Sequence, residues 1–302
     1  MRKAISTFSS EAAKKDYVQK VEERFEHELD EKVAEILFGD FPRILLLSGP
    51  SCAGKTTMAN KLVSELAERG KHVQVISLDD FFFSRKELAE VAKLNGQTLD
   101  FDSPAAIDQK TLAKSISEML AGTRVTLPVF DFKEGKRTAC RIIEPDNRAV
   151  FLLEGIQAVY PEVTSLLAGH PFRSIFVSVE TGLMVGDTIF APEEIRFFRR
   201  LVRDFRFRGA TPEFTFFLWD SVRKNELVNI LPYAPACDMT FNTVIDYEIG
   251  MLKPHLLPLL SAIPESNSHF SEARRMLLSL EGIDSIDEKY LPTHAMYHEF
   301  LG

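Results

Sequence analysis

The hydrophobic positions near the start of the chain recur every three or four residues, with charged residues between them. They include Val18, Phe25 and Leu29. This spacing is that of one face of an α-helix, so the pattern predicts an amphipathic helix over residues 10–38, ended by Gly39. Because the pattern lasts only about four heptads, it favours packing against the following domain over a coiled coil.

From residue 43 onward, short apolar runs alternate with helical stretches. The runs predict strands at 44–47, 73–78, 150–153 and 175–179, and the segment 239–260 predicts a last strand and helix. Helical spacing appears at 105–120, 193–207 and 214–228, and an extended pair at 125–130 and 138–143 flanks a turn at 133–136. This alternation predicts an α/β fold: a doubly wound, mostly parallel sheet flanked by helices, with a small β-hairpin.

The charge balance and the apolar segments exclude several classes of protein. The 302 residues include 36 Lys and Arg against 44 Asp and Glu, a net charge of -8, which argues against general affinity for nucleic acid or anionic membranes. The N-terminus has no apolar signal core, and the leucine-rich segment 251–260 is too short and proline-broken to span a bilayer. We therefore expect a cytoplasmic protein without nucleic-acid or membrane partners.

The three cysteines, Cys52, Cys140 and Cys237, are odd in number and far apart in the sequence. This spacing fits neither a disulfide framework nor a zinc site, so it predicts free thiols. No feature of the sequence specifies the oligomeric state, and a homo-oligomer remains possible.

A phosphate-binding motif follows the first predicted strand. Residues 49–56 match G-x-x-x-x-G-K-[ST], between an apolar run and a helical pattern. Such a loop curls its backbone N–H groups inward, its lysine reaches the β and γ phosphates, and its Thr56 hydroxyl suits Mg²⁺. A purely structural glycine-rich turn is the alternative. The motif predicts a nucleoside triphosphate site formed by Gly49, Pro50, Ser51, Cys52, Ala53, Gly54, Lys55, Thr56 and Thr57.

Carboxylates end the next two predicted strands of the sheet. The segment VISLDDFFF places Asp79 and Asp80 at a strand end, where either one suits a general base for phosphoryl transfer; a helix cap is the alternative. The segment AVFLLEG ends an apolar run at Glu154. That position is typical of the acidic group that holds Mg²⁺ in loop-and-lysine NTPases.

The segment RFFRRLVRDFRFRG, residues 196–209, carries six arginines in an acidic protein. Four of them, Arg196, Arg199, Arg200 and Arg203, recur at helical spacing. A solvated charged face is one interpretation. With few acidic partners in the segment, we expect instead a mobile lid that brings guanidinium groups onto the transferring phosphate.

Together these segments resemble a known family. ISLDDFF, LDFDSPAAID, VTLPVFDF, FLLEGI and RFFRRLVRDFRFRG occur in the order and spacing of the uridine kinase and phosphoribulokinase-like P-loop kinases. The resemblance covers about residues 43–250. It extends in particular to the uridine kinase-like domains that follow an N-terminal TGS region in some bacterial proteins.

The resemblance implies a P-loop NTPase fold that uses ATP and Mg²⁺. It implies a kinase domain at 41–262 with a lid at about 190–212. Outside the resemblance we expect an amphipathic helical extension at 1–40 and a helical tail at 263–302. Its implied catalytic groups are Asp79 as general base, Lys55, and the lid arginines Arg199 and Arg200, with Thr56 and Glu154 on the metal. Its implied acceptor site has Asp102 and Arg196 on the ribose hydroxyls and Phe101, Phe130, Phe132 and Ile156 around the nucleobase.

The resemblance implies an ATP-dependent kinase that phosphorylates the primary 5′ hydroxyl of a nucleoside. The family carries tyrosine where Phe130 stands and a histidine soon after the position of Phe132, and this chain has neither, so the base stays open. Two alternatives remain: a kinase of another small alcohol, such as a sugar phosphate or pantothenate, and a regulatory module that binds ATP without transfer. The pair Asp79 and Asp102 argues against the module, since a switch needs no acceptor pocket.

Overall fold

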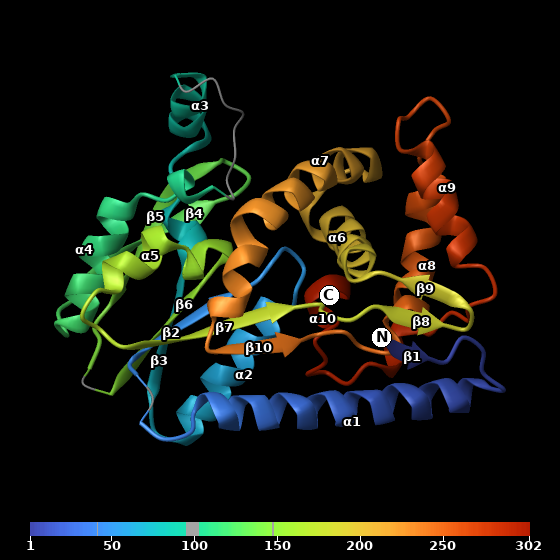
Figure 1. Cartoon of the computed structure of the whole chain (residues 1–302), viewed down its shortest axis with the longest axis horizontal. Coiled ribbons are helices and arrows are strands. Elements are labelled where there is room, and N and C mark those ends of the chain that lie inside the picture. Colours follow the sequence, from blue (N-terminus) through green and yellow to red (C-terminus); the bar gives the residue numbers. More distant parts are fainter. Residues whose placement is uncertain (41, 95–102, 147) are drawn as a thin grey trace.

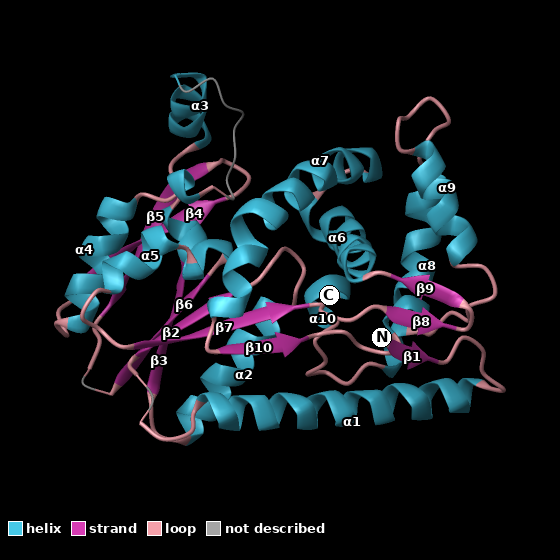
Figure 2. Ribbon diagram, viewed as in Figure 1, coloured by secondary structure: helices cyan, strands magenta, loops and turns pink. Residues whose placement is uncertain are grey.

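A parallel sheet of five strands lies at the centre of the molecule (Figures 1 and 2). The computed structural model describes residues 1–40, 42–94, 103–146 and 148–302. The strand order is β10-β7-β2-β6-β3, and every neighbouring pair is parallel. The strands are β2 (Ile44–Ser48), β3 (His72–Ser77), β6 (Ala149–Glu154), β7 (Phe172–Ser178) and β10 (Met239–Asn242). The predicted doubly wound α/β fold is confirmed.

Alternate residues of the central strand pack on opposite faces of the sheet. Leu45 and Leu47 belong to one core, whereas Ile44 and Leu46 belong to another. Every side chain of β2 is buried, which explains why its sequence is a continuous apolar run without polar alternation. The first face is covered by α1 (Glu11–Ile36), α2 (Lys55–Glu68), α6 (Pro192–Arg208) and α8 (Glu248–Ser261), and the second by α4 (Gln109–Leu120) and a β-hairpin.

The predicted hairpin forms, and the helix before it begins later than predicted. Strands β4 (Val125–Asp131) and β5 (Lys136–Ile143) pair antiparallel around the expected turn. The Asp108 side chain accepts a hydrogen bond from the Thr111 N–H, which caps α4 at Gln109. The first residues of the predicted helix form a separate 3₁₀ turn, Pro104–Ala106.

The remaining helices include predicted and unpredicted elements. The predicted helix at 214–228 is α7 (Pro212–Asn225), which continues into a π-helical turn at Glu226–Ile230. Other helices are α3 (Arg85–Leu94), α5 (Pro161–Thr164), α9 (Phe270–Ser279) and α10 (His298–Leu301). A second sheet, with the order β1-β8-β9, consists of β1 (Arg2–Ala4), β8 (Leu183–Val185) and β9 (Thr188–Phe190). Strands of three residues are too short to show a period, so the sequence did not predict them.

Both ends of the chain pack into the core of the sheet. Val18 and Phe25 of α1, and Tyr297 and Phe300 near the C-terminus, share one hydrophobic core with β2. In Figure 1, α1 runs along one side of the molecule and α10 lies near its centre. The helix at residues 10–38 therefore packs against the following domain, as predicted.

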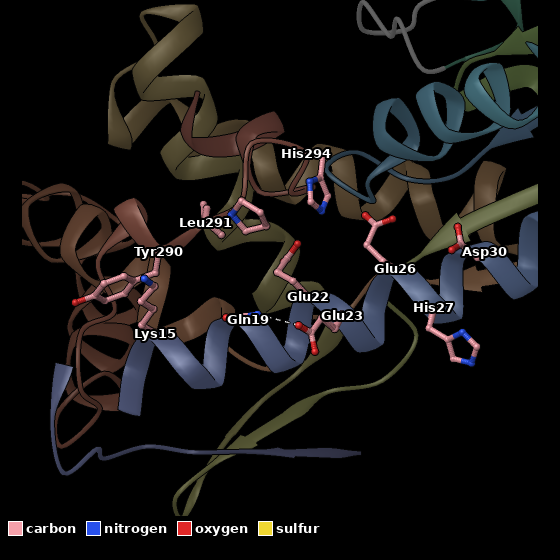
Figure 3. A pocket seen from close by; sticks show the side chains of 11 residues that line it. Lys15, Gln19, Glu22, Glu23, Glu26, His27, Asp30, Tyr290, Leu291 and His294 are labelled. Carbon is pink, nitrogen blue, oxygen red and sulfur yellow. Dashed lines mark hydrogen bonds between the residues drawn. The ribbon is translucent and has the colours of Figure 1, made fainter. Parts of the chain in front are cut away.

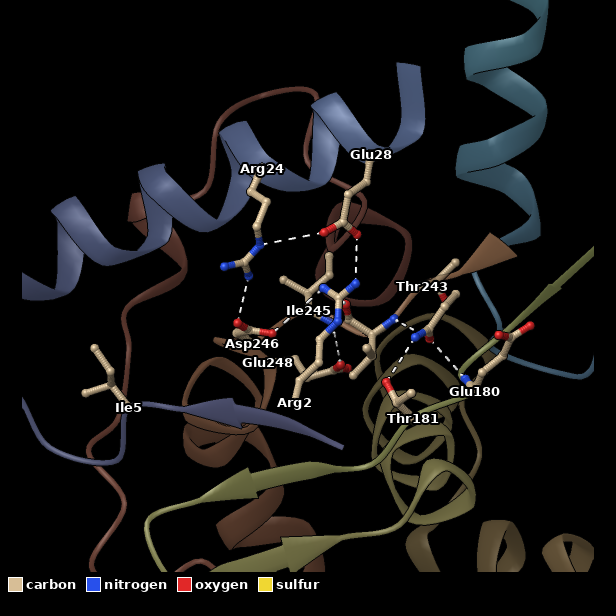
Figure 4. Close-up of polar contacts among 12 residues, drawn as sticks. Arg2, Ile5, Arg24, Glu28, Glu180, Thr181, Thr243, Ile245, Asp246 and Glu248 are labelled. Carbon is tan, nitrogen blue, oxygen red and sulfur yellow. Dashed lines mark hydrogen bonds and ion pairs between the residues drawn. The ribbon is translucent and has the colours of Figure 1, made fainter. Parts of the chain in front are cut away.

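Ion pairs hold the N-terminal segment against the loop after β10. The Arg2 guanidinium lies 2.7 Å from the Glu28 carboxylate of α1, and the Arg24 guanidinium lies 2.7 Å from the Asp246 carboxylate (Figure 4).

None of the helices in the described ranges combines the length and apolar composition needed to cross a membrane. The three cysteines are free, as predicted.

Candidate active site

The phosphate-binding motif forms a tight loop between β2 and α2. A side chain at Gly49 would place its Cβ 2.0 Å from the Val177 carbonyl oxygen of β7, so only glycine fits there. Gly54 has a φ of 89° and precedes the first residue of α2. The Lys55 ammonium donates to the carbonyl oxygens of Gly49 (2.9 Å) and Pro50 (3.2 Å). The loop thus meets a helix N-terminus, where partial positive charge favours phosphate.

A cavity of about 280 Å³ opens where this loop meets the C-terminal ends of β3 and β6. Nine of the predicted site residues line it: Ser51, Cys52, Lys55, Thr56, Asp79, Phe132, Glu154, Ile156 and Arg200. They come from five separated parts of the sequence, which the fold brings to one place. The cavity therefore combines phosphate-binding, acidic and apolar groups in a single site.

The two adjacent aspartates after β3 have different surroundings. Asp80 accepts a hydrogen bond from the Phe130 N–H (3.0 Å) and so anchors the hairpin to the strand end. Asp79 lines the cavity together with Lys55. The sequence left the choice of general base open between the two, and this geometry favours Asp79.

The oxygen donors suited to a metal lie on neighbouring elements. Ser77 and Glu154 are paired across β3 and β6, and the Ser77 hydroxyl donates to the Glu154 carboxylate (2.7 Å). Thr56, in the first turn of α2, lines the same cavity. One carboxylate and one hydroxyl fit the chemistry of Mg²⁺, which keeps several waters and binds substrate phosphates.

Arg199 does not reach the cavity, contrary to the prediction of a phosphate-binding lid arginine. Its side chain is fully buried and forms two bonds with the Glu248 carboxylate, at 2.8 and 3.2 Å. It also donates to the carbonyl oxygens of Cys52 (3.3 Å) and Thr243 (2.7 Å). Burial opposes the charge on Arg199, but Glu248 and Tyr297 together outweigh burial and raise the pKa of the guanidinium. Arg199 therefore supports the phosphate loop from behind as a permanent cation.

Arg196, which the resemblance assigned to the ribose hydroxyls, is also bound within the protein and does not line the cavity. Both of its terminal nitrogens donate to the Glu226 carboxylate (2.5 and 2.7 Å), and one donates to the Ser51 carbonyl oxygen (3.2 Å). Its guanidinium lies 5.6 Å from the centre of the Trp219 ring. The partners Glu226 and Glu248 are distant in sequence, so the arginine segment alone could not reveal them.

Three arginines of α6 line the cavity. Arg200 donates to the Ser51 hydroxyl (3.1 Å), and Arg203 and Arg208 also line the cavity. The sequence singled out Arg200 and Arg203 by their spacing but did not place Arg208 in the site. These three guanidiniums line the cavity, whereas those of Arg196 and Arg199 do not, and each of the three also pairs with the Asp204 carboxylate.

The predicted nucleobase residues separate into exposed and buried groups. The Phe132 side chain is 56% exposed and lines the cavity with Ile156. Phe130 is buried and packs behind it, with ring centres 5.3 Å apart. Val222 of α7, which the sequence did not indicate, forms part of the cavity wall. Phe101 and Asp102 lie outside the described residues.

Another groove, of about 570 Å³, separates α1 from residues 290–294 (Figure 3). Glu22 lines this groove, and one oxygen of its carboxylate accepts a hydrogen bond from the Tyr247 hydroxyl. Its other oxygen has no hydrogen-bond partner among the described residues. Burial raises the pKa of Glu22, although the bond from Tyr247 opposes the shift. His294 lines this groove and also a third cavity that reaches the phosphate loop.

The sheet, the phosphate loop and the acidic strand ends are those of a P-loop phosphotransferase. Residues 44–249, more than half of the chain, match the sequence model of the Phosphoribulokinase / Uridine kinase family. The chain belongs to this family.

Several relatives are uridine kinases by name. The uridine kinase of Deinococcus deserti is 30% identical over 173 residues, which cover 57% of this chain and 73% of the relative. That of Schizosaccharomyces pombe is 32% identical over 173 residues, and the match covers 55% of this chain and only 33% of the longer relative. These relationships identify a kinase and leave its acceptor open.

Solved structures of a phosphoribulokinase and of a possible uridine kinase align with most of this chain. For phosphoribulokinase from Rhodobacter spheroides the TM-score is 0.48 at 16% identity, with 79% of this chain and 95% of that chain covered. For a possible uridine kinase from Bacillus stearothermophilus the TM-score is 0.45 at 19% identity, and the match covers 72% of this chain and 99% of that chain.

Proposed function

We propose that this protein transfers the γ-phosphoryl group of ATP to the primary 5′ hydroxyl of a nucleoside. The observation that supports this proposal is the composition of one cavity. Asp79, Lys55 and Glu154 contribute charged groups to its lining, and Phe132 and Ile156 contribute apolar surface. A carboxylate beside the phosphate loop suits a hydroxyl acceptor, and the apolar wall suits a flat base.

In this mechanism the nucleoside base packs against Phe132, and its 5′ hydroxyl lies beside Asp79. Asp79 accepts the hydroxyl proton as the oxygen attacks the γ phosphorus in line. The bond between the γ phosphorus and the bridging oxygen breaks, and ADP leaves with that electron pair. Lys55 exchanges its bonds to loop carbonyls for bonds to phosphate, and Arg200 adds positive charge. Asp102 remains our candidate for the ribose hydroxyls.

Thr56 and Glu154 would hold Mg²⁺, which when bound neutralises charge on the β and γ phosphates. Ser77 orients Glu154 through its hydrogen bond, so this carboxylate is held in one position before the nucleotide binds.

A second candidate function, phosphorylation of a sugar phosphate, is favoured by the cavity charge. Arg203 and Arg208 line the cavity in addition to Arg200. Both also pair with Asp204 and can meet the phosphates of ATP, and a phosphorylated acceptor would bring a second anion to them, which a neutral nucleoside does not.

The experiment is ADP release with ATP and Mg²⁺ across a panel of nucleosides, sugar phosphates and pantothenate. We expect a nucleoside to give the highest kcat/KM, and we expect Lys55→Ala to abolish turnover while the circular dichroism spectrum stays unchanged. A sugar phosphate as the best acceptor would favour the second candidate. ATP binding without turnover of any acceptor would instead favour a regulatory module.

A further inference from the structure

A carboxylate from the C-terminal tail lies beside the phosphate loop. The Thr57 hydroxyl, in the first turn of α2, donates to the Glu299 carboxylate of α10 (3.3 Å). Neighbouring tail residues are tightly packed, since Phe300 and Leu301 are buried in the core. The tail also approaches the loop at Gly54, where an added Cβ would lie 2.8 Å from the Met296 sulfur. Glu299 is therefore a fixed part of the site.

Glu299 lies at the junction of two cavities. It lines the active-site cavity with Lys55, and it also lines an adjoining groove of about 640 Å³. Thr56 likewise lines both, so the two spaces meet at the first turn of α2. The groove is formed by α1, α2 and the tail, and its lining includes Glu26, Thr57, Asn60, Ser64, His294 and Glu299.

The groove has the length and position expected for the nucleoside part of a phosphate donor. Along α2 it extends from Thr57 to Ser64, which spans roughly 10 Å at the helical rise per residue. A triphosphate bound by the loop directs its ribose and base away from the γ phosphate. The ribose lies between phosphates and base, and Glu299 lies between the phosphate cavity and the groove.

We propose that this groove binds the nucleoside of the donor and that Glu299 accepts hydrogen bonds from its two ribose hydroxyls. This inference rests on the proposed use of a ribonucleoside triphosphate. A carboxylate beside a polyphosphate is electrostatically unfavourable, and two charge-assisted hydrogen bonds from a vicinal diol offset that cost. A donor without one hydroxyl leaves the carboxylate partly unpaired, so the site discriminates against it.

The test measures dissociation constants of the full-length protein by calorimetry in Mg²⁺. The ligands are ATP, 2′-deoxyATP, 3′-deoxyATP and inorganic tripolyphosphate, which has no ribose. We expect ATP to bind on the order of ten-fold tighter than either deoxynucleotide. In Glu299→Ala the ratio of the dissociation constant of each deoxynucleotide to that of ATP should fall to about one, because none of the three ligands then has a carboxylate to bind its ribose. Tripolyphosphate affinity should stay the same or increase.

Two further variants separate this role from a structural one. Glu299→Gln preserves the shape of the side chain and should give an intermediate ratio, because it retains an acceptor without the charge. Glu281→Ala removes an exposed tail carboxylate that lines neither cavity, and it should keep the wild-type ratio.

Two results would overturn the inference while leaving the kinase proposal intact. One is a wild-type protein that binds ATP and the two deoxynucleotides with nearly equal dissociation constants. The other is a Glu299→Ala protein that gains equal affinity for ATP, both analogues and tripolyphosphate, which would show that Glu299 only repels phosphate. Binding of no nucleotide, or equal binding by Lys55→Ala, would overturn the proposed function and the inference together.

Discussion

At the scale of single residues, Asp79 and Asp80 show how adjacent identical side chains acquire different roles. Asp80 holds the hairpin backbone through Phe130, whereas Asp79 faces the cavity. We expect Asp79→Asn to lower kcat by roughly 10² or more with little change in ATP affinity, because a general base acts mainly in the transition state. Steady-state kinetics and ATP calorimetry measure both quantities.

The matched control is Asp80→Asn, which retains an acceptor for the Phe130 N–H. It should keep most of the wild-type kcat. A large loss of kcat in Asp80→Asn combined with a small loss of kcat in Asp79→Asn would identify Asp80 as the general base.

At the scale of elements, α6 carries arginines of two kinds. Arg199 forms a buried pair with Glu248, and Arg200 bonds to Ser51 at the cavity. Removing one partner of a buried pair leaves an uncompensated charge, so Arg199→Ala should lower the free energy of unfolding by about 3–5 kcal/mol. Arg200→Ala should instead lower kcat with a much smaller loss of stability.

Urea denaturation and kinetics of the two variants test this division. If Arg199→Ala retained its stability and lost kcat, the side chain would act on the phosphate after all, as the sequence suggested. Equal losses of stability in both variants would show that α6 has no separate catalytic face.

The helix α1 contains a buried acid whose ionisation opposes folding. Burial raises the pKa of Glu22 above 4.5, so between the two values the folded chain binds more protons than the unfolded chain. The contribution of Glu22 to stability is therefore full below pH 4.5 and is lost as pH rises through the raised pKa. We expect the free energy of unfolding of Glu22→Gln to depend less on pH than that of the wild type.

Chemical denaturation at several values between about pH 5 and pH 8 measures this dependence. Glu23→Gln, at the exposed neighbouring position, is the control and should follow the wild-type curve. Parallel curves for all three proteins would show that Glu22 titrates normally in the folded state.

At the scale of the whole molecule, the C-terminal tail is part of the core that carries the phosphate loop. Phe300 is fully buried, and its ring lies 5.2 Å from the Arg199 guanidinium and 5.5 Å from Tyr297. Phe300→Ala should lower the free energy of unfolding by about 3–5 kcal/mol, because it leaves a cavity beside α6.

Thermal and urea unfolding test this prediction. Leu278→Ala, an exposed apolar position of α9, is the control and should change stability little. An unchanged stability for Phe300→Ala would show that the tail contributes no packing energy to the kinase core.

The sequence by itself determined the features that depend on interactions between residues near one another in the chain. Helical spacing revealed α1 and α6, and short apolar runs revealed the central strands. The phosphate-loop motif specified its turn through glycines that backbone contacts require. Carboxylates at strand ends located Asp79 and Glu154 at the site, since parallel strands end at the same edge of the sheet.

Only the tertiary structure decided the roles that depend on contacts between distant segments. Periodicity showed that the arginines share a helix, but the buried carboxylates Glu226 and Glu248 selected which of them face away from the cavity. No motif marks Glu299, which reaches the phosphate loop because the tail packs against α6. Charge pairing between distant segments acts through space, so a pattern along the chain carries no record of it.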